Sequence, residues 1–199
     1  MGEAGADDGQ VVRASLGTPA EFALVFDRHF ADIHRFVTRR VGRDVADDLA
    51  ASVFVEAFAG RASFDVTTES ARPWLFGIAT NLLRRHHRTE VRRLRAYARH
   101  GVDPVTAAVG ELERVEATTD GPRIARALAA LQKRDRDVLL LYAWADLTYE
   151  EVADALGVPV GTVRSRMSRA RRIMRARLGA QAHERSEELG LLHGGELDG

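Results

Sequence analysis

The segment LTYEEVADALGVPVGTVRSRMSRARRIMRARL, residues 147–178, constrains the fold more than any other part of the chain. Thr148 is followed three residues later by Glu151, which is a capping box that opens a helix. Gly157 then ends this helix, and Pro159 precedes the next one. Ala153 and Gly157 are small, so the two helices can cross closely. This pattern predicts a helix-turn-helix motif.

The second helix of this motif has two different faces. At 3.6 residues per turn, one narrow apolar face holds Val160, Val163, Met167, Ala170, Met174 and Leu178. The opposite face holds Arg164, Ser165, Ser168, Arg169, Arg172 and Arg175. Arginine and serine side chains suit the base edges and phosphates of a DNA major groove. A solvated basic face, or a site for an acidic protein or a membrane surface, is the alternative. Membrane binding fits poorly because the apolar face lacks bulky aromatic residues.

The rest of the chain shows apolar residues at helical spacing and no strand-like alternation. The predicted fold class is therefore all-α, with two small helical domains joined by a flexible linker. The expected organisation is a disordered N-terminal extension at 1–17, a first unit at 18–100, a linker at 101–121, a second unit at 122–178 and an acidic tail at 179–199. Thr18 is expected to cap the first helix and Asp44 the second, and the tail is expected to fray or to be disordered.

A long helix predicted after Pro73 gives a second nucleic-acid signal. One arc of this helix carries Trp74, Gly77, Asn81, Arg84, Arg85 and Arg88. An aromatic ring beside arginines suits unstacked single-stranded bases, because the ring stacks on a base while the cations follow the backbone. The alternative is that Trp74 packs in an ordinary core. The helix at 45–58 is apolar on more than one face, so it is either sandwiched inside its unit or docked on a partner protein.

Composition excludes several classes of function. The chain has no cysteine, so disulfides, thiolate zinc sites and cysteine nucleophiles are excluded together. The histidines at 29 and 34 are five residues apart, and those at 86 and 87 are adjacent, so neither pair has the spacing of a helical metal site. A glycine-rich phosphate loop is also missing. We therefore expect no enzyme activity, no catalytic residue, no metal and no cofactor, in a cytoplasmic protein without membrane insertion.

With both units in view, the chain resembles the sigma-70 family of bacterial RNA polymerase sigma factors, in its small extracytoplasmic-function (ECF) group. Three passages carry the resemblance: DVADDLAASVFVEAF at 44–58, WLFGIATNLLRRHHR at 74–88 and LTYEEVADALGVPVGTVRSRMSRAR at 147–171. In the family they are the polymerase-clamp helix, the −10 region and the −35 reader. The resemblance covers residues 21–88 and 124–178, and it departs from the family at Ala51-Ser52, where the clamp helix usually has Gln-Glu.

The resemblance implies partners and site residues. The partners would be core RNA polymerase, through its β′ clamp and β flap, promoter DNA, and an anti-sigma factor that covers the polymerase-binding faces. The implied clamp contacts are Asp47, Asp48, Leu49 and Phe54. The implied −10 contacts are Trp74, Asn81, Arg84 and Arg88, with Phe64 and its loop bordering a captured base. The implied −35 contacts are Arg164, Ser165, Ser168 and Arg169, with Thr162 near the DNA backbone.

An alternative from another class stays open on the residues alone. A stand-alone two-domain regulator would use the helix-turn-helix without polymerase, while its first unit dimerises or senses a ligand. Such a protein would bind duplex DNA specifically and would not melt a promoter. The acidic tail could also shield the arginine-rich helix within the same molecule. The formal net charge of zero does not argue against DNA binding, because the compensating acids lie mainly in the clamp helix, the linker and the tail.

Overall fold

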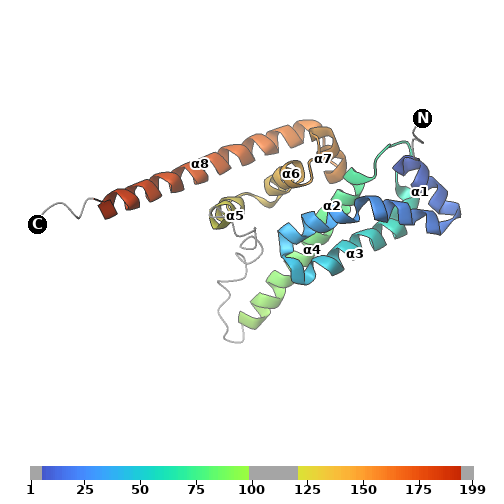
Figure 1. The fold of residues 1–199 in the computed structure, drawn as a ribbon, viewed down its shortest axis with the longest axis horizontal. Coiled ribbons are helices and arrows are strands. Elements are labelled where there is room, and N and C mark those ends of the chain that lie inside the picture. The colour runs from blue at the N-terminus through green and yellow to red at the C-terminus, as the bar shows by residue number, and fades with distance from the viewer. Residues whose placement is uncertain (1–5, 99–120, 194–199) are drawn as a thin grey trace, which may run out of the picture.

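The computed structural model describes residues 6–98 and 121–193, and within these ranges every regular element is a helix (Figure 1). The first unit contains α1 (Asp8–Gly17), the 3-10 helix η1 (Pro19–Phe22), α2 (Ala23–Val41), α3 (Arg43–Gly60), the 3-10 helix η2 (Arg61–Ser63) and α4 (Arg72–Ala98). The second unit contains α5 (Gly121–Ala129), α6 (Lys133–Trp144), α7 (Tyr149–Leu156) and α8 (Val160–His193). The prediction of an all-α fold with two helical units is confirmed.

The core of the first unit lies where α2, α3 and α4 meet. Ile33 and Val37 of α2 and Val53 of α3 are fully buried there. Phe36 packs edge-on against Phe76 of α4, with ring centroids 5.2 Å apart. The chain turns from α2 into α3 at Gly42, whose φ of 77° lies in the region that favours glycine. Packing of these apolar stripes, rather than helix propensity, holds the three helices together.

The prediction of a disordered extension at 1–17 is wrong for residues 8–17, which form α1. The carboxylate of Asp7 accepts a hydrogen bond of 2.7 Å from the backbone N–H of Gln10 and so caps the helix. Val11 and Val12 are buried against the rest of the unit. The segment has too few apolar residues to show a helical stripe in the sequence. Its order comes from contacts with distant parts of the chain.

The starts of α2 and α3 also differ from the prediction. Thr18 makes no side-chain capping bond, because the 3-10 turn that starts at Pro19 stands between it and α2. Residue Gly42, rather than Asp44, directly precedes α3, and Asp44 lies within its first turn. The sequence correctly predicted that a helix starts at Pro19, but it predicted an α-helix where the structure has a 3-10 helix. Proline fits the first position of both kinds.

In the second unit, α5, α6 and α7 pack around the first half of α8. Val138 and Leu141 of α6 and Val163 and Met167 of α8 are buried, and the two helices pack on each other. The expectation that the tail is frayed or disordered differs from the structure, because α8 runs on past Gly179 to His193 and extends beyond α5 (Figure 1). Alanine, glutamate, glutamine and arginine, which all favour helix, dominate residues 180–188. The predicted linker at 101–121 lies outside the described residues except for Gly121, where α5 begins.

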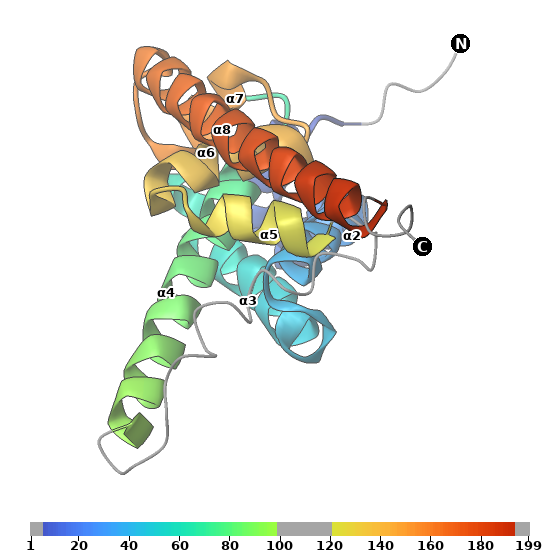
Figure 2. The same ribbon diagram turned by 90° about the vertical axis from the view of Figure 1, so that its left-hand side faces the viewer.

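The two units contact each other through α4 and α7. Gly77 is buried at the crossing, and a Cβ added to it would lie 3.2 Å from the carbonyl carbon of Ala155 and closer still to its oxygen. Beside this crossing, Asp137 of α6 accepts hydrogen bonds from Arg40 Nη2 of α2 at 3.2 Å and from Arg84 Nε of α4 at 2.8 Å. The C-terminal turns of α4 project away from both units (Figure 2). The described structure is therefore a closed arrangement of the two units.

Candidate nucleic-acid interface

The helix-turn-helix is built as its sequence predicts. Thr148 Oγ1 accepts a 3.2 Å hydrogen bond from the N–H of Glu151, and Glu151 Oε2 accepts one of 2.7 Å from the N–H of Thr148. Gly157 ends α7 in the left-handed conformation, at φ 61° and ψ 43°. Val163, Met167 and Ala170 are buried on the inner face of α8. These contacts fix the direction in which the outer face of α8 points.

The predicted −35 contacts lie together on that outer face. Arg164, Ser165, Ser168, Arg169 and Arg172 are exposed, and Thr162 is half-buried in the first turn of α8. The hydroxyl of Ser165 donates to the carbonyl of Thr162 at 3.0 Å, so its lone pairs remain available to a DNA donor. Tyr149, Arg164 and Arg172 are among the residues that line a shallow groove where α7 meets α8. This surface can present several cations and hydroxyls to a duplex at once.

Arg169 differs from its neighbours on this face. Its Nε and Nη2 both donate to the carboxylate of Asp135 at 3.2 Å, although the side chain is 52% exposed. Asp135 is 2% exposed, so the pair joins a buried acid of α6 to α8. Arg164 lies 3.6 Å from Glu150, with both side chains mostly exposed. Arg164 is therefore free to exchange its partner for DNA, whereas the fork of Arg169 is already occupied.

The second candidate surface starts with an aromatic pair. Phe64 lies at the end of η2 and Trp74 in the first turn of α4, with ring centroids 4.7 Å apart and an angle of 41° between the rings. Both residues are half-buried. Trp74 thus packs partly on the core and also leaves part of its ring accessible. Core packing and an accessible ring, the two alternatives that the sequence left open for Trp74, are therefore both present.

The polar residues of this surface divide between two directions. Asn81 is exposed, and its Oδ1 accepts a 3.4 Å hydrogen bond from Arg84 Nη1. Arg84 is tied to Asp137 of the second unit, whereas Arg85 pairs with Glu56 of α3. Arg88 is exposed, and it lines a cavity of about 250 Å³ between the units together with basic residues of α2 and α6. The structure therefore groups Phe64 with Trp74 and Asn81 with Arg84, and it places Arg85 apart.

The predicted clamp residues on α3 also separate. Asp47 and Asp48 are exposed, and Asp47 Oδ1 lies 2.7 Å from His34 Nε2. Leu49 is half-buried. Phe54, the fourth predicted clamp residue, is 5% exposed in this structure, so a partner would reach its ring only after a local rearrangement. It packs against two rings of α2, Phe26 and Phe30, at centroid distances of 4.9 Å and 6.0 Å.

The next residue on α3, Val55, points the other way. Its side chain is 68% exposed, and the ring of Phe58 one turn later is 36% exposed. The sequence showed that this helix is apolar on more than one face, and the structure shows which face is covered. Phe58 packs against Phe22 and lies under the guanidinium of Arg61, 3.9 Å from its ring centroid, so Val55 is the more exposed apolar side chain of the two. An exposed apolar side chain on a helix that also presents two exposed carboxylates suits docking on a protein better than docking on DNA.

Three organising acids were missed by reasoning from the sequence. Asp135 and Asp137 are both 2% exposed as whole residues, and each holds an arginine from another helix. Asp8 is 4% exposed and pairs with Arg28 and His29 of α2. The available signal was position, because Asp137 directly precedes the apolar run VLLL and Asp135 lies two residues earlier. Acids at the start of an amphipathic helix can fall near its buried face.

The described residues include neither a metal cluster nor a membrane-spanning helix. Within 6–98 and 121–193, no three or more histidine, aspartate and glutamate side chains form a group that could hold a metal ion. No helix within them is long and apolar enough to cross a bilayer.

Comparisons with known proteins match both units. The family described as Sigma-70 region 2 matches residues 25–93, and Sigma-70, region 4 matches residues 122–174. The chain is 35% identical over 144 residues to the RNA polymerase sigma factor HrpL of Pseudomonas syringae pv. syringae, covering 70% of this chain and 77% of that protein. It is 36% identical over 144 residues to the ECF RNA polymerase sigma factor SigC of Mycobacterium tuberculosis (strain CDC 1551 / Oshkosh), covering 70% and 74%.

Two solved structures are similar to most of the chain. CnrH in complex with the cytosolic domain of CnrY superposes with a TM-score of 0.62 at 24% identity, over 87% of this chain and 97% of that one, which shows the fold. The sigma factor RpoE in complex with the anti-sigma factor NepR from Bartonella quintana gives 0.56 at 25% identity, over 81% and 96%. The chain therefore belongs to the sigma-70 family of RNA polymerase sigma factors, in its ECF group, and so to a class of transcription initiation factors rather than enzymes.

Proposed function

We propose that this sigma factor reads the −35 element of its promoters with the outer face of α8 and stabilises the opened −10 strand with the N-terminal half of α4. The observation that carries the proposal is the pairing of two different surfaces in one chain. One is a rigid basic helix face, and the other is an accessible aromatic pair with cations beside it. A duplex suits the first surface, and an unstacked strand suits the second.

At the −35 element, Arg164 is the best candidate for reading a base. Its side chain is 66% exposed and the carboxylate of Glu150 lies 3.6 Å away, so the fork can turn to a guanine edge. Ser165 and Ser168 would contact base edges or phosphates. Thr162 and Arg172 would follow the DNA backbone. Arg169, held by Asp135, would reach a phosphate with its remaining nitrogen and keep α8 at the right angle.

At the −10 element, the Phe64–Trp74 pair would border a base that has left the stack. Asn81 and Arg84 would contact the same strand, and Arg85 and Arg88 would supply charge along its backbone. Arg84 is bound to Asp137 in the closed arrangement, so its use on DNA requires the two units to separate. Separation also fits a factor that must contact two promoter elements at once.

Polymerase docking would use surfaces that DNA leaves free. Asp47, Asp48 and Leu49 of α3, extended by Val55, would dock on the β′ clamp. The half-buried apolar side chains Leu139, Met174 and Leu178 line a groove beside α8 that would contact the β flap. By similarity to the solved complexes with anti-sigma partners, an anti-sigma factor would cover these faces and compete with core polymerase. Because it works with RNA polymerase, we place the protein in the cytoplasm.

Run-off transcription with purified core polymerase on a promoter library tests the proposal. The wild-type chain should select start sites downstream of a shared pair of elements. Arg164→Ala should lose preference at particular −35 positions, while the matched control Arg177→Ala, an exposed arginine later on the same helix, should keep it. Sequence-specific duplex binding without polymerase, together with no start-site selection, would contradict the proposal and favour a stand-alone regulator.

A further inference from the structure

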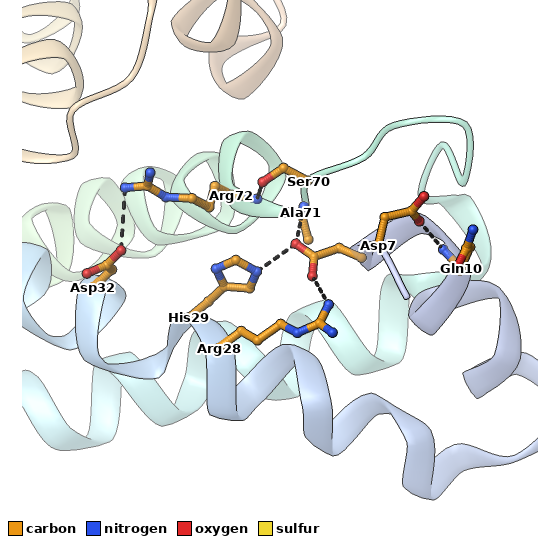
Figure 3. Close-up of polar contacts among 9 residues, drawn as sticks. Asp7, Gln10, Arg28, His29, Asp32, Ser70, Ala71 and Arg72 are labelled. Atoms are coloured by element: carbon orange, nitrogen blue, oxygen red, sulfur yellow. Dashed lines mark hydrogen bonds and ion pairs between the residues drawn. The ribbon is translucent and has the colours of Figure 1, made fainter. Parts of the chain in front are cut away.

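The N-terminal helix α1 is joined directly to the loop that separates the aromatic pair, residues 64–71. Arg28, His29 and the N–H of Ala71 converge on one carboxylate in Figure 3, which is that of Asp8. Asp8 Oδ1 accepts from Arg28 Nη1 at 2.9 Å, while Oδ2 accepts from the N–H of Ala71 at 2.8 Å and lies 2.6 Å from His29 Nε2. The backbone N–H of Asp8 donates to the carbonyl of Glu69 at 3.1 Å.

The backbone of the loop lies directly on α1 at the next residue. A Cβ added to Gly9 would fall 2.5 Å from the carbonyl oxygens of both Val66 and Thr68. Real Cβ atoms do not approach backbone oxygens so closely, so only glycine permits this contact without a shift of the loop. Two adjacent residues of α1 thus hold the middle and the end of the loop.

The tip of the loop is closed by its own hydrogen bonds. Asp65 Oδ1 accepts from the N–H of Thr67 at 3.0 Å and from its hydroxyl at 2.7 Å. The hydroxyl of Thr68 donates to the carbonyl of Asp65 at 2.6 Å. The tip is therefore a rigid turn, and its contacts with α1 set its position in the molecule.

The position of this loop sets the geometry of the aromatic pair. Phe64 is the first residue of the loop, and Trp74 follows Ala71 by three residues in the first turn of α4. Ala71 is fully buried, and its N–H is held by Asp8, so the start of α4 is fixed relative to α2. Burial alone would raise the pKa of Asp8, but hydrogen bonds from His29, the N–H of Ala71 and Arg28 hold it far below its ordinary value. The carboxylate is therefore charged and can hold its partners firmly at neutral pH.

We propose that Asp8, with Gly9, is a positioning residue for −10 recognition: it fixes the loop at 64–71 so that Phe64 and Trp74 accept a promoter base in one orientation. This inference rests on the proposed role of that aromatic pair. Asp8 does not touch the DNA in this account. It acts through the loop, as residues that support a binding site from behind commonly do.

Two variants disturb the loop by independent routes. Asp8→Ala removes the carboxylate and leaves the N–H of Ala71 without its acceptor. Gly9→Ala keeps the carboxylate and pushes the carbonyls of Val66 and Thr68 away. Asp7→Ala is the matched control, because Asp7 caps α1 through Gln10 and is next to Asp8 in sequence, yet the structure records no bond from it to the loop.

Run-off transcription should be measured with core polymerase on promoters that carry each of the four bases at each −10 position. The quantity of interest is the ratio of transcripts between bases, because unfolded molecules make no transcript and leave this ratio unchanged. Asp8→Ala and Gly9→Ala should lower the ratio of transcripts from the preferred base to those from the other bases by about tenfold, which is the order of one base contact. Asp7→Ala should leave this ratio unchanged. A uniform fall on all promoters, with the ratio intact, would show a role in folding only and would overturn the proposal.

A second measurement on the free protein separates this inference from the proposed function. The chain has two tryptophans, so in a Trp144→Phe background the fluorescence reports on Trp74 alone. Acrylamide should quench Trp74 more strongly in Asp8→Ala and Gly9→Ala than in the parent or in Asp7→Ala. Equal quenching in all four proteins would refute the positioning role. A third outcome is stronger quenching in Asp8→Ala and Gly9→Ala combined with no −10 base preference in the parent. It would refute the proposed role of the aromatic pair and, with it, the proposal that Asp8 supports base recognition.

Discussion

Gly77 should control whether the two units stay together. It lies in α4 at the crossing with α7, where an added Cβ would meet the backbone of Ala155 at less than van der Waals distance. The atoms that it would meet belong to the helix backbone, which cannot move aside as a flexible side chain can. Gly77→Ala must therefore push α4 and α7 apart by about 1 Å, since packed interiors leave no such space.

The magnitude follows from two opposing terms. Alanine favours the helical state of α4 over glycine by about 1 kcal/mol, whether or not the units touch. The clash affects only the closed arrangement, at about 1–3 kcal/mol for overpacking, with a further loss of about 1 kcal/mol as the hydrogen bonds to Asp137 lengthen. A total of about 2–4 kcal/mol lowers the ratio of closed to open molecules by roughly 30-fold to 1,000-fold. The variant should thus open the protein while stabilising its first unit.

Energy transfer between two dyes measures this directly. The chain has no cysteine, so Ala51→Cys on α3 and Ala176→Cys on α8, both at exposed positions, give one label on each unit. Transfer should fall in Gly77→Ala, and the thermal midpoint of the first unit should be unchanged or higher. Gly161→Ala is the matched control, because it is also a helical glycine and nothing lies within 4 Å of the added Cβ. Unchanged transfer in Gly77→Ala, or an equal fall in Gly161→Ala, would refute the reasoning.

Three further predictions concern single side chains. Arg164→Ala should cost about 1–3 kcal/mol of binding free energy at particular −35 bases, measured by competition between promoters. Arg169→Ala should weaken binding to all sequences alike, and it should lower the stability of the second unit by about 1–2 kcal/mol in thermal unfolding. Phe54→Ala should lower the free energy of unfolding in urea by about 3–5 kcal/mol, as for a buried ring, and a much smaller loss would contradict the burial of Phe54. The folded-state pKa of Asp8 is lowered, so its stabilisation is present above about pH 4 and is lost as the pH falls through the folded value. The stability deficit of Asp8→Asn should therefore shrink on acidification below about pH 4, and a deficit independent of pH would contradict the charged pair.

Local signals predicted the helices that carry the two surfaces proposed to bind DNA, because apolar stripes and caps are properties of short segments. The capping box at Thr148 and Glu151 is one such signal, and it is present as predicted. Helix α1 was missed because its order depends on Asp8, whose partners lie in α2 and just before α4. The burial of Phe54 against α2 was not predicted, for a related reason. A helix that is apolar on two faces does not reveal in its sequence which face its own unit covers.

The arginines of α8 show the same limit at the level of single side chains. Periodicity places Arg164 and Arg169 on one face, and the structure agrees that both are exposed. What separates them is a carboxylate contributed by another helix, since Asp135 holds Arg169 at two nitrogens. An alanine scan along α8 would therefore mix lost DNA contacts with an unpaired buried acid. A double-mutant cycle with Asp135→Asn, measured on DNA affinity, separates these two effects. Asp135→Asn removes the charge that Arg169 balances and leaves Arg169 able to reach DNA. Coupling between these two positions, and its absence between Asp135 and Arg164, is what distinguishes an arginine that supports the recognition helix from one that reads DNA.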